Sequence, residues 1–269
     1  MTLTATILGC SSSAGVPRPA LGWGACDPAN PRNRRRRCSL LVERTGHDGG
    51  RTRVLIDTSP DLREQLLDAN VDWLDGVFFT HEHADHTHGI DDLRSLYIHR
   101  RRRLDLYLDE AAARVVLHRF GYCFVTPPGS EYPPIAIEHR IAPDKPITVK
   151  GAGGEIVVLP FLQDHGDIPS LGFRFDGLAY SSDLIGLPDA SLPALADLDI
   201  WIVDALRYRP HPSHFSVDDA LRWIERIDPV RAVLTNLHAD LDYEVLRGKL
   251  PVHVVPAFDG MSFTVAEAP

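Results

Sequence analysis

The segment His81-Glu82-His83-Ala84-Asp85-His86 places three histidines and two carboxylates within six residues. Imidazole nitrogen and carboxylate oxygen are ligands for zinc, manganese and iron, and the geometry of the site decides between these metals. The spacing differs from that of the zincin helix, which has its second histidine at the position that Asp85 occupies here. In an extended or turning segment, His81 and His83 can point to one side and hold one metal ion. Asp85 and His86 begin the next turn and can point toward a second ion.

The cluster follows an apolar run, Gly76-Val77-Phe78-Phe79-Thr80, which predicts a buried strand that ends at the histidines. The alternative is a solvated histidine-rich loop, but such loops belong to polar tracts. The position of the cluster therefore favours a metal site.

Strand and helix patterns alternate along the rest of the chain. Strands are predicted at 4–8, 38–42, 53–56, 76–80, 104–108, 156–161, 171–175, 178–181, 200–203, 230–234, 252–255 and 261–265. Helical spacing of apolar residues predicts helices at 60–69, 110–120 and 217–227. This pattern favours an α/β sandwich in which helices cover packed sheets. Segments 11–37 and 122–134 are irregular, and loops of such length are usually functional.

Composition narrows the class of protein. The 269 residues are 44% hydrophobic and 24% charged, which is typical of a globular chain and excludes a disordered one. Without a repeat or a low-complexity linker, we expect a single domain over residues 1–269. The net charge of −9 argues against a nucleic-acid partner, and no apolar stretch is long enough for a membrane span. Four widely spaced cysteines and the lack of a signal-like start predict a cytoplasmic protein.

The motif His-x-His-x-Asp-His after an apolar strand resembles that of the metallo-β-lactamase superfamily. The resemblance implies a four-layer αββα sandwich, classed as α/β (α+β), with a site for two divalent ions. It also implies that His165 is the third histidine, Asp183 the carboxylate that bridges the ions, and His238 the last histidine. The ligands of one ion would then be His81, His83, His165 and Asp183, and those of the other Asp85, His86, His238 and Asp183.

Asp57, in Leu55-Ile56-Asp57-Thr58, resembles the family's buried aspartate beneath the metal loop. Its implied role is to orient that loop through hydrogen bonds. The alternative is that Asp57 belongs to the N-terminal end of the helix predicted at 60–69.

His214, in Pro210-His211-Pro212-Ser213-His214-Phe215-Ser216, stands where phosphodiesterase branches of the superfamily place a histidine that is not a ligand. The resemblance implies that His214 is catalytic and donates a proton to the leaving alkoxide. The alternative is a residue at the N-terminal end of the helix predicted at 217–227.

The local sequence around His214, with Val203-Asp204-Ala205-Leu206-Arg207 upstream, resembles the cyclic-phosphate phosphodiesterases of phosphonate breakdown and, more distantly, the ribonuclease Z group. The segments at 9–17, 31–34 and 237–243 support the resemblance to the first group. Members of the first group often carry paired cysteines in the first long loop, which hold a structural zinc. This chain has Cys26 alone there, so we interpret it as a lone thiol and do not expect that zinc.

Two metal ions about 3.5–4 Å apart can share a hydroxide and stabilise both the attacking and the leaving oxygen. We therefore expect a dinuclear manganese or zinc hydrolase, a phosphodiesterase that cleaves a small cyclic phosphate or nucleotide-like ester. The alternatives are a ribonuclease Z-like RNA-processing nuclease, a thioester or lactam hydrolase, and a non-catalytic metal- or cofactor-binding protein of the same fold. The expected partner is the small phosphate ester. The sequence leaves the oligomeric state open, with a homodimer as one option.

Two arginine runs, 34–37 and 100–103, could contact phosphate because guanidinium groups match phosphate oxygens. For 100–103 a solvated face is the favoured interpretation. For 34–37 both interpretations stay open.

Overall fold

The computed structural model describes residues 2–265, so Met1 and residues 266–269 of the predicted domain lie outside the described residues. Two seven-stranded sheets form the framework, in the orders β14-β1-β2-β3-β4-β5-β6 and β13-β12-β11-β10-β9-β8-β7. The strands of the first sheet are β1 (Thr2–Gly9), β2 (Ser39–Thr45), β3 (Arg51–Ile56), β4 (Gly76–Phe78), β5 (Leu104–Leu108), β6 (Ala136–Arg140) and β14 (Ser262–Val265). Those of the second are β7 (Ile147–Gly151), β8 (Gly154–His165), β9 (Ile168–Phe175), β10 (Leu178–Ser181), β11 (Ile200–Asp204), β12 (Arg231–Thr235) and β13 (Val254–Pro256).

The two sheets have the same plan. In each, one half is antiparallel and the other half is parallel: β3, β4, β5 and β6 run parallel in the first sheet, and β10, β11, β12 and β13 in the second. Because these strands are parallel, their carboxyl ends lie at the same edge of each sheet. In open sheets this edge is where ligands bind.

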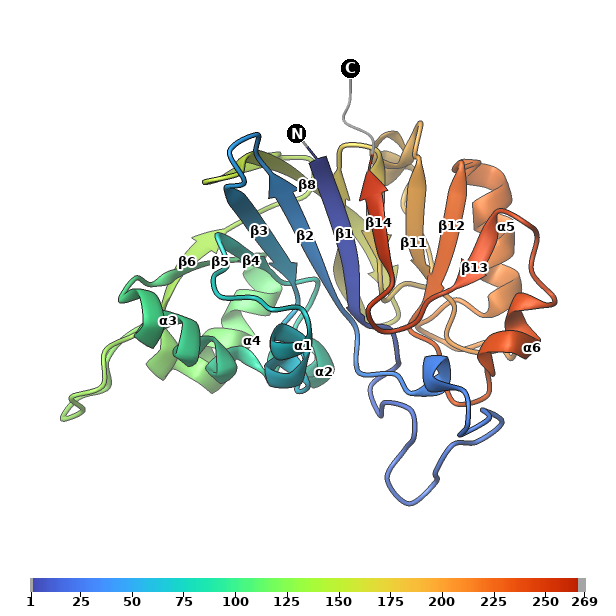
Figure 1. Ribbon diagram of the computed structural model, residues 1–269, viewed down its shortest axis with the longest axis horizontal. Coiled ribbons are helices and arrows are strands. Elements are labelled where there is room, and N and C mark those ends of the chain that lie inside the picture. The colour runs from blue at the N-terminus through green and yellow to red at the C-terminus, as the bar shows by residue number, and fades with distance from the viewer. Residues whose placement is uncertain (1, 266–269) are drawn as a thin grey trace.

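Helices cover the outer face of each sheet, as Figure 1 shows. They are α1 (Leu62–Asp68), α2 (Ala84–Thr87), α3 (Arg94–Arg100), α4 (Glu110–Phe120), α5 (Val217–Ile227) and α6 (Tyr243–Arg247), with short 3₁₀ turns at Pro31–Asn33, Ile90–Leu93, Gly121–Cys123 and Asp189–Leu195. The helices α1, α3 and α4 lie outside the first sheet, α5 and α6 lie outside the second, and α2 lies at the lower end of the sheets in this view. The predicted αββα sandwich is confirmed.

Apolar side chains on both faces of each sheet explain the four layers. The core between the sheets takes Leu40 and Val42 from β2, and the outer core beneath the helices takes Leu41 from the same strand. Leu178 and Ala179 of β10 divide in the same way between the central core and the core beneath α5. Strands buried on both faces read as continuous apolar runs, as these do.

The long irregular segment 11–37 extends beyond the lower end of the sheets in Figure 1, where α2 and α6 also lie. A small apolar cluster of Val16, Trp23, Cys26 and Ala239 holds this loop against the chain that precedes α6. No helix among residues 2–265 is both long and apolar enough to cross a membrane.

Candidate metal centre

The side chains predicted to bind metal lie where strands end. His81 follows β4, His165 is the last residue of β8, Asp183 follows β10, and His238 follows β12. Asp57 follows β3 with a φ angle of 64°, a left-handed conformation that aspartate tolerates better than bulky residues do. This turn lets the chain leave the strand directly beneath the histidine loop.

Asp57 is fully buried and holds the histidine loop from below. Its carboxylate accepts hydrogen bonds from the backbone nitrogen of Thr80 (2.8 Å), from the Thr80 hydroxyl (2.8 Å) and from Nδ1 of His86 (2.7 Å). Burial raises the pKa of Asp57, while His86 and Thr80 oppose that shift. These contacts fit the predicted orienting role, and they differ from those of a helix-capping residue.

Three imidazole rings converge on the first side of the site. Nδ1 of His83 lies 2.9 Å from Nε2 of His81 and 3.3 Å from Nε2 of His165. The Thr80 hydroxyl, whose proton goes to the carboxylate below, accepts a hydrogen bond from Nδ1 of His81, and the Ser213 carbonyl accepts one from Nδ1 of His165. Both Nε2 atoms therefore carry lone pairs, and one proton on His83 can satisfy only one of them. A shared cation would satisfy all three nitrogens.

The second side of the site is formed by His86 and two carboxylates. Nδ1 of His86 binds Asp57, so Nε2 faces Asp183 Oδ1 at 3.3 Å and Asp85 Oδ2 at 3.5 Å. Burial lowers the pKa of His86, but the carboxylates around it, Asp183 first, outweigh burial and hold that pKa well above the usual value. Burial raises the pKa of Asp183, and the histidines, His86 first, more than reverse that shift. The carboxylates of Asp183, Asp57 and Asp85 therefore stabilise positive charge at the position of His86.

The donor set fits divalent metal ions. The ligand atoms of His81, His83 and His165 lie within 4.8 Å of one another, and so do those of His81, His86 and Asp183. Asp183 Oδ1 is buried, and Nε2 of His86 faces it at 3.3 Å without the geometry of a good hydrogen bond. A buried carboxylate oxygen is costly unless a cation lies beside it, and the charged form of His86 or a metal ion can be that cation. Nitrogen and carboxylate donors of this kind suit zinc or manganese.

His238 is the least closely placed of the seven predicted ligands. It lines one pocket together with Asp85 and Asp183. Its Nδ1 lies 2.9 Å from Oδ1 of Asp240 and 3.1 Å from the Asp240 backbone nitrogen. Within residues 2–265, no hydrogen bond or ion pair joins His238 to the other predicted ligands, so the structure brings it to the site but not into contact.

His214 lies in the loop before α5, whose N-terminus is capped by Ser216 and not by His214. Nδ1 of His214 is 2.8 Å from Oδ2 of Asp204 and 3.7 Å from Oδ2 of Asp183. Burial lowers the pKa of His214, but the Asp204 carboxylate outweighs burial and raises that pKa to about 9. Burial raises the pKa of Asp204 to about 7, and His214 opposes the shift. Asp204 therefore favours the charged form of His214 and holds the ring beside the predicted metal ligands.

Sequence reasoning missed two arginines of the site. The pocket of about 460 Å³ at the metal ligands is lined also by Arg18 and Arg207, which come from the loop 11–37 and from the chain after β11. Both stand alone in the sequence rather than in a run. The placement of Arg18 on the long irregular segment was the one signal that pointed to it.

The arginine runs serve other contacts. Arg36 forms an ion pair with Asp259 and Arg37 one with Asp61, while Arg35 is buried and donates to the Leu241 carbonyl. None of the residues 34–37 lines the metal pocket. These arginines fasten the long loop to the rest of the molecule, so the structure favours the structural interpretation over phosphate binding.

Cys26 is a free, buried thiol. Its sulfur lies 3.5 Å from the carbonyl oxygens of Ala239 and of Leu241, and the single thiol proton can be donated to either of them. It therefore helps to join the long loop to the segment that follows His238.

Comparison with known proteins gives the family. The family model for the beta-lactamase superfamily domain matches residues 52–238, which is more than half of the chain. A solved structure described as a new diphosphatase from the PhnP family is 34% identical, covers 97% of each chain and superimposes with a TM-score of 0.85. Human tRNase Z, short form, is 16% identical with a TM-score of 0.64 over 98% of this chain and 99% of its own, which shows a shared fold alone.

A curated relative, an octanoyltransferase of Porphyromonas gingivalis, is 34% identical over 266 residues, or 97% of this chain. The chain spans about half, 51%, of that relative's length. The strand-end histidines and carboxylates, the two-sheet sandwich and the family match agree: the chain belongs to the beta-lactamase superfamily and has the metallo-β-lactamase fold.

Proposed function

We propose that this protein is a phosphodiesterase that cleaves a small cyclic phosphate or nucleotide-like ester with two divalent ions, zinc or manganese. The ligands of one ion would be His81, His83, His165 and Asp183, and those of the other Asp85, His86, His238 and Asp183. Ions bound there would supply Lewis-acid chemistry, which activates water and stabilises charge on a phosphoryl group. The chain's own residues hold those ions, orient the ester and supply a proton.

The observation that carries the proposal is the pair of His214 and Asp204 beside Asp183. An alkoxide leaves a phosphodiester at neutral pH only at high cost unless it receives a proton. His214 binds Asp204 through Nδ1, so Nε2 holds the transferable proton, and a pKa of about 9 keeps the ring charged at pH 7. Asp183, 3.7 Å away, places this donor beside the ligands.

The alternatives lack such support. A thioester leaves as a thiolate, which is stable without a proton, so His214 would have no comparable task there. The net charge of −9 counts against a tRNA substrate. The similar solved structure is described as a diphosphatase, which supports chemistry at phosphorus for this chain as well.

Hydrolysis of bis(p-nitrophenyl) phosphate tests the proposal. We expect no turnover after chelation and recovery when manganese or zinc is added back. His81→Ala should lose turnover, and His253→Ala, which changes an exposed histidine outside the site, should retain it. A protein that binds metal but cleaves no phosphodiester with either ion would refute the phosphodiesterase and leave the non-catalytic alternative.

A further inference from the structure

The chain that follows β12 places a buried amide beside His214. Asn236 comes directly after that strand, lines the metal pocket and is only 2% exposed. Its φ angle of 59° is left-handed, a conformation that asparagine adopts more readily than most residues with a side chain. A buried amide is costly unless it is hydrogen-bonded, so its partners indicate its role.

The amide nitrogen of Asn236 binds the carboxylate that also binds His214. Nδ2 of Asn236 lies 3.2 Å from Oδ1 of Asp204 and 3.1 Å from Nδ1 of His214. Nδ1 of His214 donates to the other oxygen of Asp204, Oδ2, at 2.8 Å. Because this Nδ1 carries a proton, it cannot accept one from Asn236. Two nitrogen donors therefore lie side by side, and each binds a different oxygen of one carboxylate.

The two oxygens of Asp204 differ in the number of their donors. Oδ2 accepts from His214 and from the backbone nitrogen of Leu184 (3.2 Å), whereas Asn236 is the one donor to Oδ1 among residues 2–265. Asp204 is fully buried, so bulk water does not replace a lost donor. Without Asn236 the carboxylate is held at one oxygen only and can turn about its Cβ–Cγ bond. Oδ2 would then no longer be fixed against the ring.

The amide of Asn236 has one favourable orientation. Turned by 180°, it would place its own Oδ1 against Oδ1 of Asp204, so that two acceptors would face each other. In the observed orientation Oδ1 of Asn236 faces Cys38, whose sulfur lies 3.9 Å away. A thiol is a weak donor and suits the acceptor side of the amide. The surroundings therefore select the orientation that donates to Asp204.

The backbone that carries Asn236 is itself fixed. The next nitrogen, that of Leu237, donates to the Cys10 carbonyl at 2.8 Å, and that of His238 donates to the Leu206 carbonyl at 2.9 Å. These contacts join the segment to the end of β1 and to the chain after β11. A group that positions another must itself be rigid, because small displacements of catalytic groups are costly in rate.

We propose that Asn236 is a positioning residue for the proton donor: its amide fixes the Asp204 carboxylate, which fixes the ring of His214 with Nε2 free to donate. The inference rests on the proposed function and names a further residue that this function requires. Asn236 acts through Asp204 and not on the ester. A misplacement of about 1 Å can cost about 100-fold in rate, so the loss of the amide should lower kcat and not raise KM.

Asn236→Gly is the primary variant, because glycine adopts the left-handed conformation without strain and lacks the amide. On adenosine 2′,3′-cyclic phosphate, whose leaving group is a sugar alkoxide, we expect kcat to fall at least about tenfold with KM unchanged. Bis(p-nitrophenyl) phosphate should be affected far less, since p-nitrophenolate leaves without a proton. Metal content is measured on the same preparation, because the predicted ligand His238 is two residues away.

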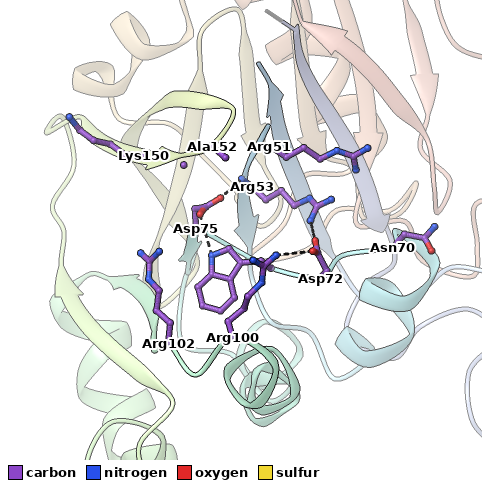
Figure 2. A pocket seen from close by; sticks show the side chains of 11 residues that line it. Arg51, Arg53, Asn70, Asp72, Asp75, Arg100, Arg102, Lys150 and Ala152 are labelled. Atoms are coloured by element: carbon purple, nitrogen blue, oxygen red, sulfur yellow. Dashed lines mark hydrogen bonds and ion pairs between the residues drawn. The ribbon is translucent and has the colours of Figure 1, made fainter. Parts of the chain in front are cut away.

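Asn70→Gly is the matched control. Asn70 also has a left-handed φ angle, 51°, but it is exposed and lines a different hollow, of about 700 Å³, together with Arg53 and Arg100 (Figure 2). This variant should leave kcat and KM unchanged on both substrates. The difference between the two glycine variants therefore measures the loss of the Asn236 amide and not the change to glycine.

A double variant tests whether Asn236 acts through His214. In the His214→Ala background the ring is absent, so Asn236→Gly should cause no further loss of kcat on the cyclic phosphate. A merely structural role would give the same loss in both backgrounds. Asn236→Asp is the second variant if the glycine variant does not fold. It keeps the size of the side chain but replaces the donor with an acceptor, and it should show the same selective loss.

The orientation of the ring provides a readout without turnover. In a crystal structure of Asn236→Gly, we expect Nδ1 of His214 to lie beyond hydrogen-bond distance of Asp204 or the ring to take more than one orientation. A ring that stays in place overturns the positioning role. Equal losses on both substrates, equal losses in both backgrounds or loss of metal also overturn it and leave the phosphodiesterase intact. A native protein that cleaves neither diester refutes the phosphodiesterase, and the ring orientation then still decides whether Asn236 positions His214.

Discussion

Nδ1 of His214 lies 2.8 Å from Oδ2 of Asp204, a fully buried carboxylate at the end of β11. The same carboxylate also accepts from the backbone nitrogen of Leu184 (3.2 Å) and from Nδ2 of Asn236 (3.2 Å). Asp204 is thus fixed from several sides and in turn fixes the ring. A ring bound through Nδ1 can donate into the pocket only from Nε2, so this contact sets the direction of proton donation.

Asp204→Asn should shift the pH dependence of the reaction. In the native protein the pKa of His214 is raised to about 9, so His214 is charged below that pH and loses its proton as the pH rises through it. Without the carboxylate, burial lowers the pKa of His214 unopposed by Asp204. The basic limb of kcat/KM should therefore move toward neutral pH, as measured with a substrate that has an alkoxide leaving group.

Asp218→Asn is the matched control for this profile, since Asp218 is exposed on the first turn of α5. Its profile should coincide with that of the native protein. If the basic limb of Asp204→Asn also stayed in place, Asp204 would not control the proton of His214.

His214→Ala should separate acid catalysis from metal binding. General acid catalysis typically contributes about 10²–10⁴-fold, so the variant should lose that order of rate on esters with a sugar alkoxide. p-Nitrophenolate leaves without a proton, so bis(p-nitrophenyl) phosphate should be affected far less. The two rates are measured on the same preparation, together with its metal content.

Metal content decides between the roles of His214. Equal rate losses on both substrates, with the metal retained, would indicate a positioning role. Loss of metal would make His214 a ligand, and its ring does lie close to His165 and Asp183.

The sequence predicted the fold well where apolar patterns were strong. The helices at 110–120 and 217–227 have the predicted bounds, and the predicted strands match strands of the two sheets to within a few residues. The helices α2 and α6, each of five residues or fewer, were also missed, as were α3, β6 and β7. The last three bury few apolar side chains: Leu96 alone in α3, Ala136 alone in β6 and Val149 alone in β7. Their formation depends on neighbouring strands and helices, which a local pattern does not contain.

The residues of the candidate site could be predicted only in part from the sequence. The histidine loop is a local motif, and the resemblance supplied His165 and Asp183, which the fold brings together with it. Arg18 and Arg207 stand 189 positions apart in the sequence, and only the long loop folded against the chain after β12 brings them into one pocket. The two arginine runs gave a stronger local signal, yet Arg36, Arg37, Arg100 and Arg102 of these runs form ion pairs away from the pocket.

Asp57→Ala should weaken metal retention without removing a direct ligand. The Asp57 carboxylate accepts from Thr80 twice and from His86 once, and its loss leaves these buried donors without an acceptor. A buried donor left unsatisfied costs about 1–3 kcal/mol, so we expect at least this loss in the free energy of unfolding. Chemical denaturation and metal analysis after dialysis measure the two effects.

Asp218→Ala removes an exposed carboxylate and is the control. It should change the free energy of unfolding by no more than about 0.5 kcal/mol, and metal retention should stay at the native level. Anomalous scattering from crystals grown with zinc provides the decisive observation. A metal bonded directly to Asp57 would show that it is a ligand and not a residue that orients the loop.

Asp183→Ala should lower metal occupancy on both sides of the site. Asp183 lies between the two groups of histidines, with Oδ1 3.3 Å from Nε2 of His86 and Oδ2 3.9 Å from Nε2 of His165. If this carboxylate bridges two ions, its removal takes an anionic ligand from each of them. His165→Ala, in contrast, removes a ligand from only one ion. Elemental analysis after dialysis should therefore show little metal in Asp183→Ala and an intermediate content in His165→Ala, with both proteins folded by circular dichroism. Two tightly held ions per chain in Asp183→Ala would contradict the bridging role, and equal metal contents in the two variants would favour a site with a single ion.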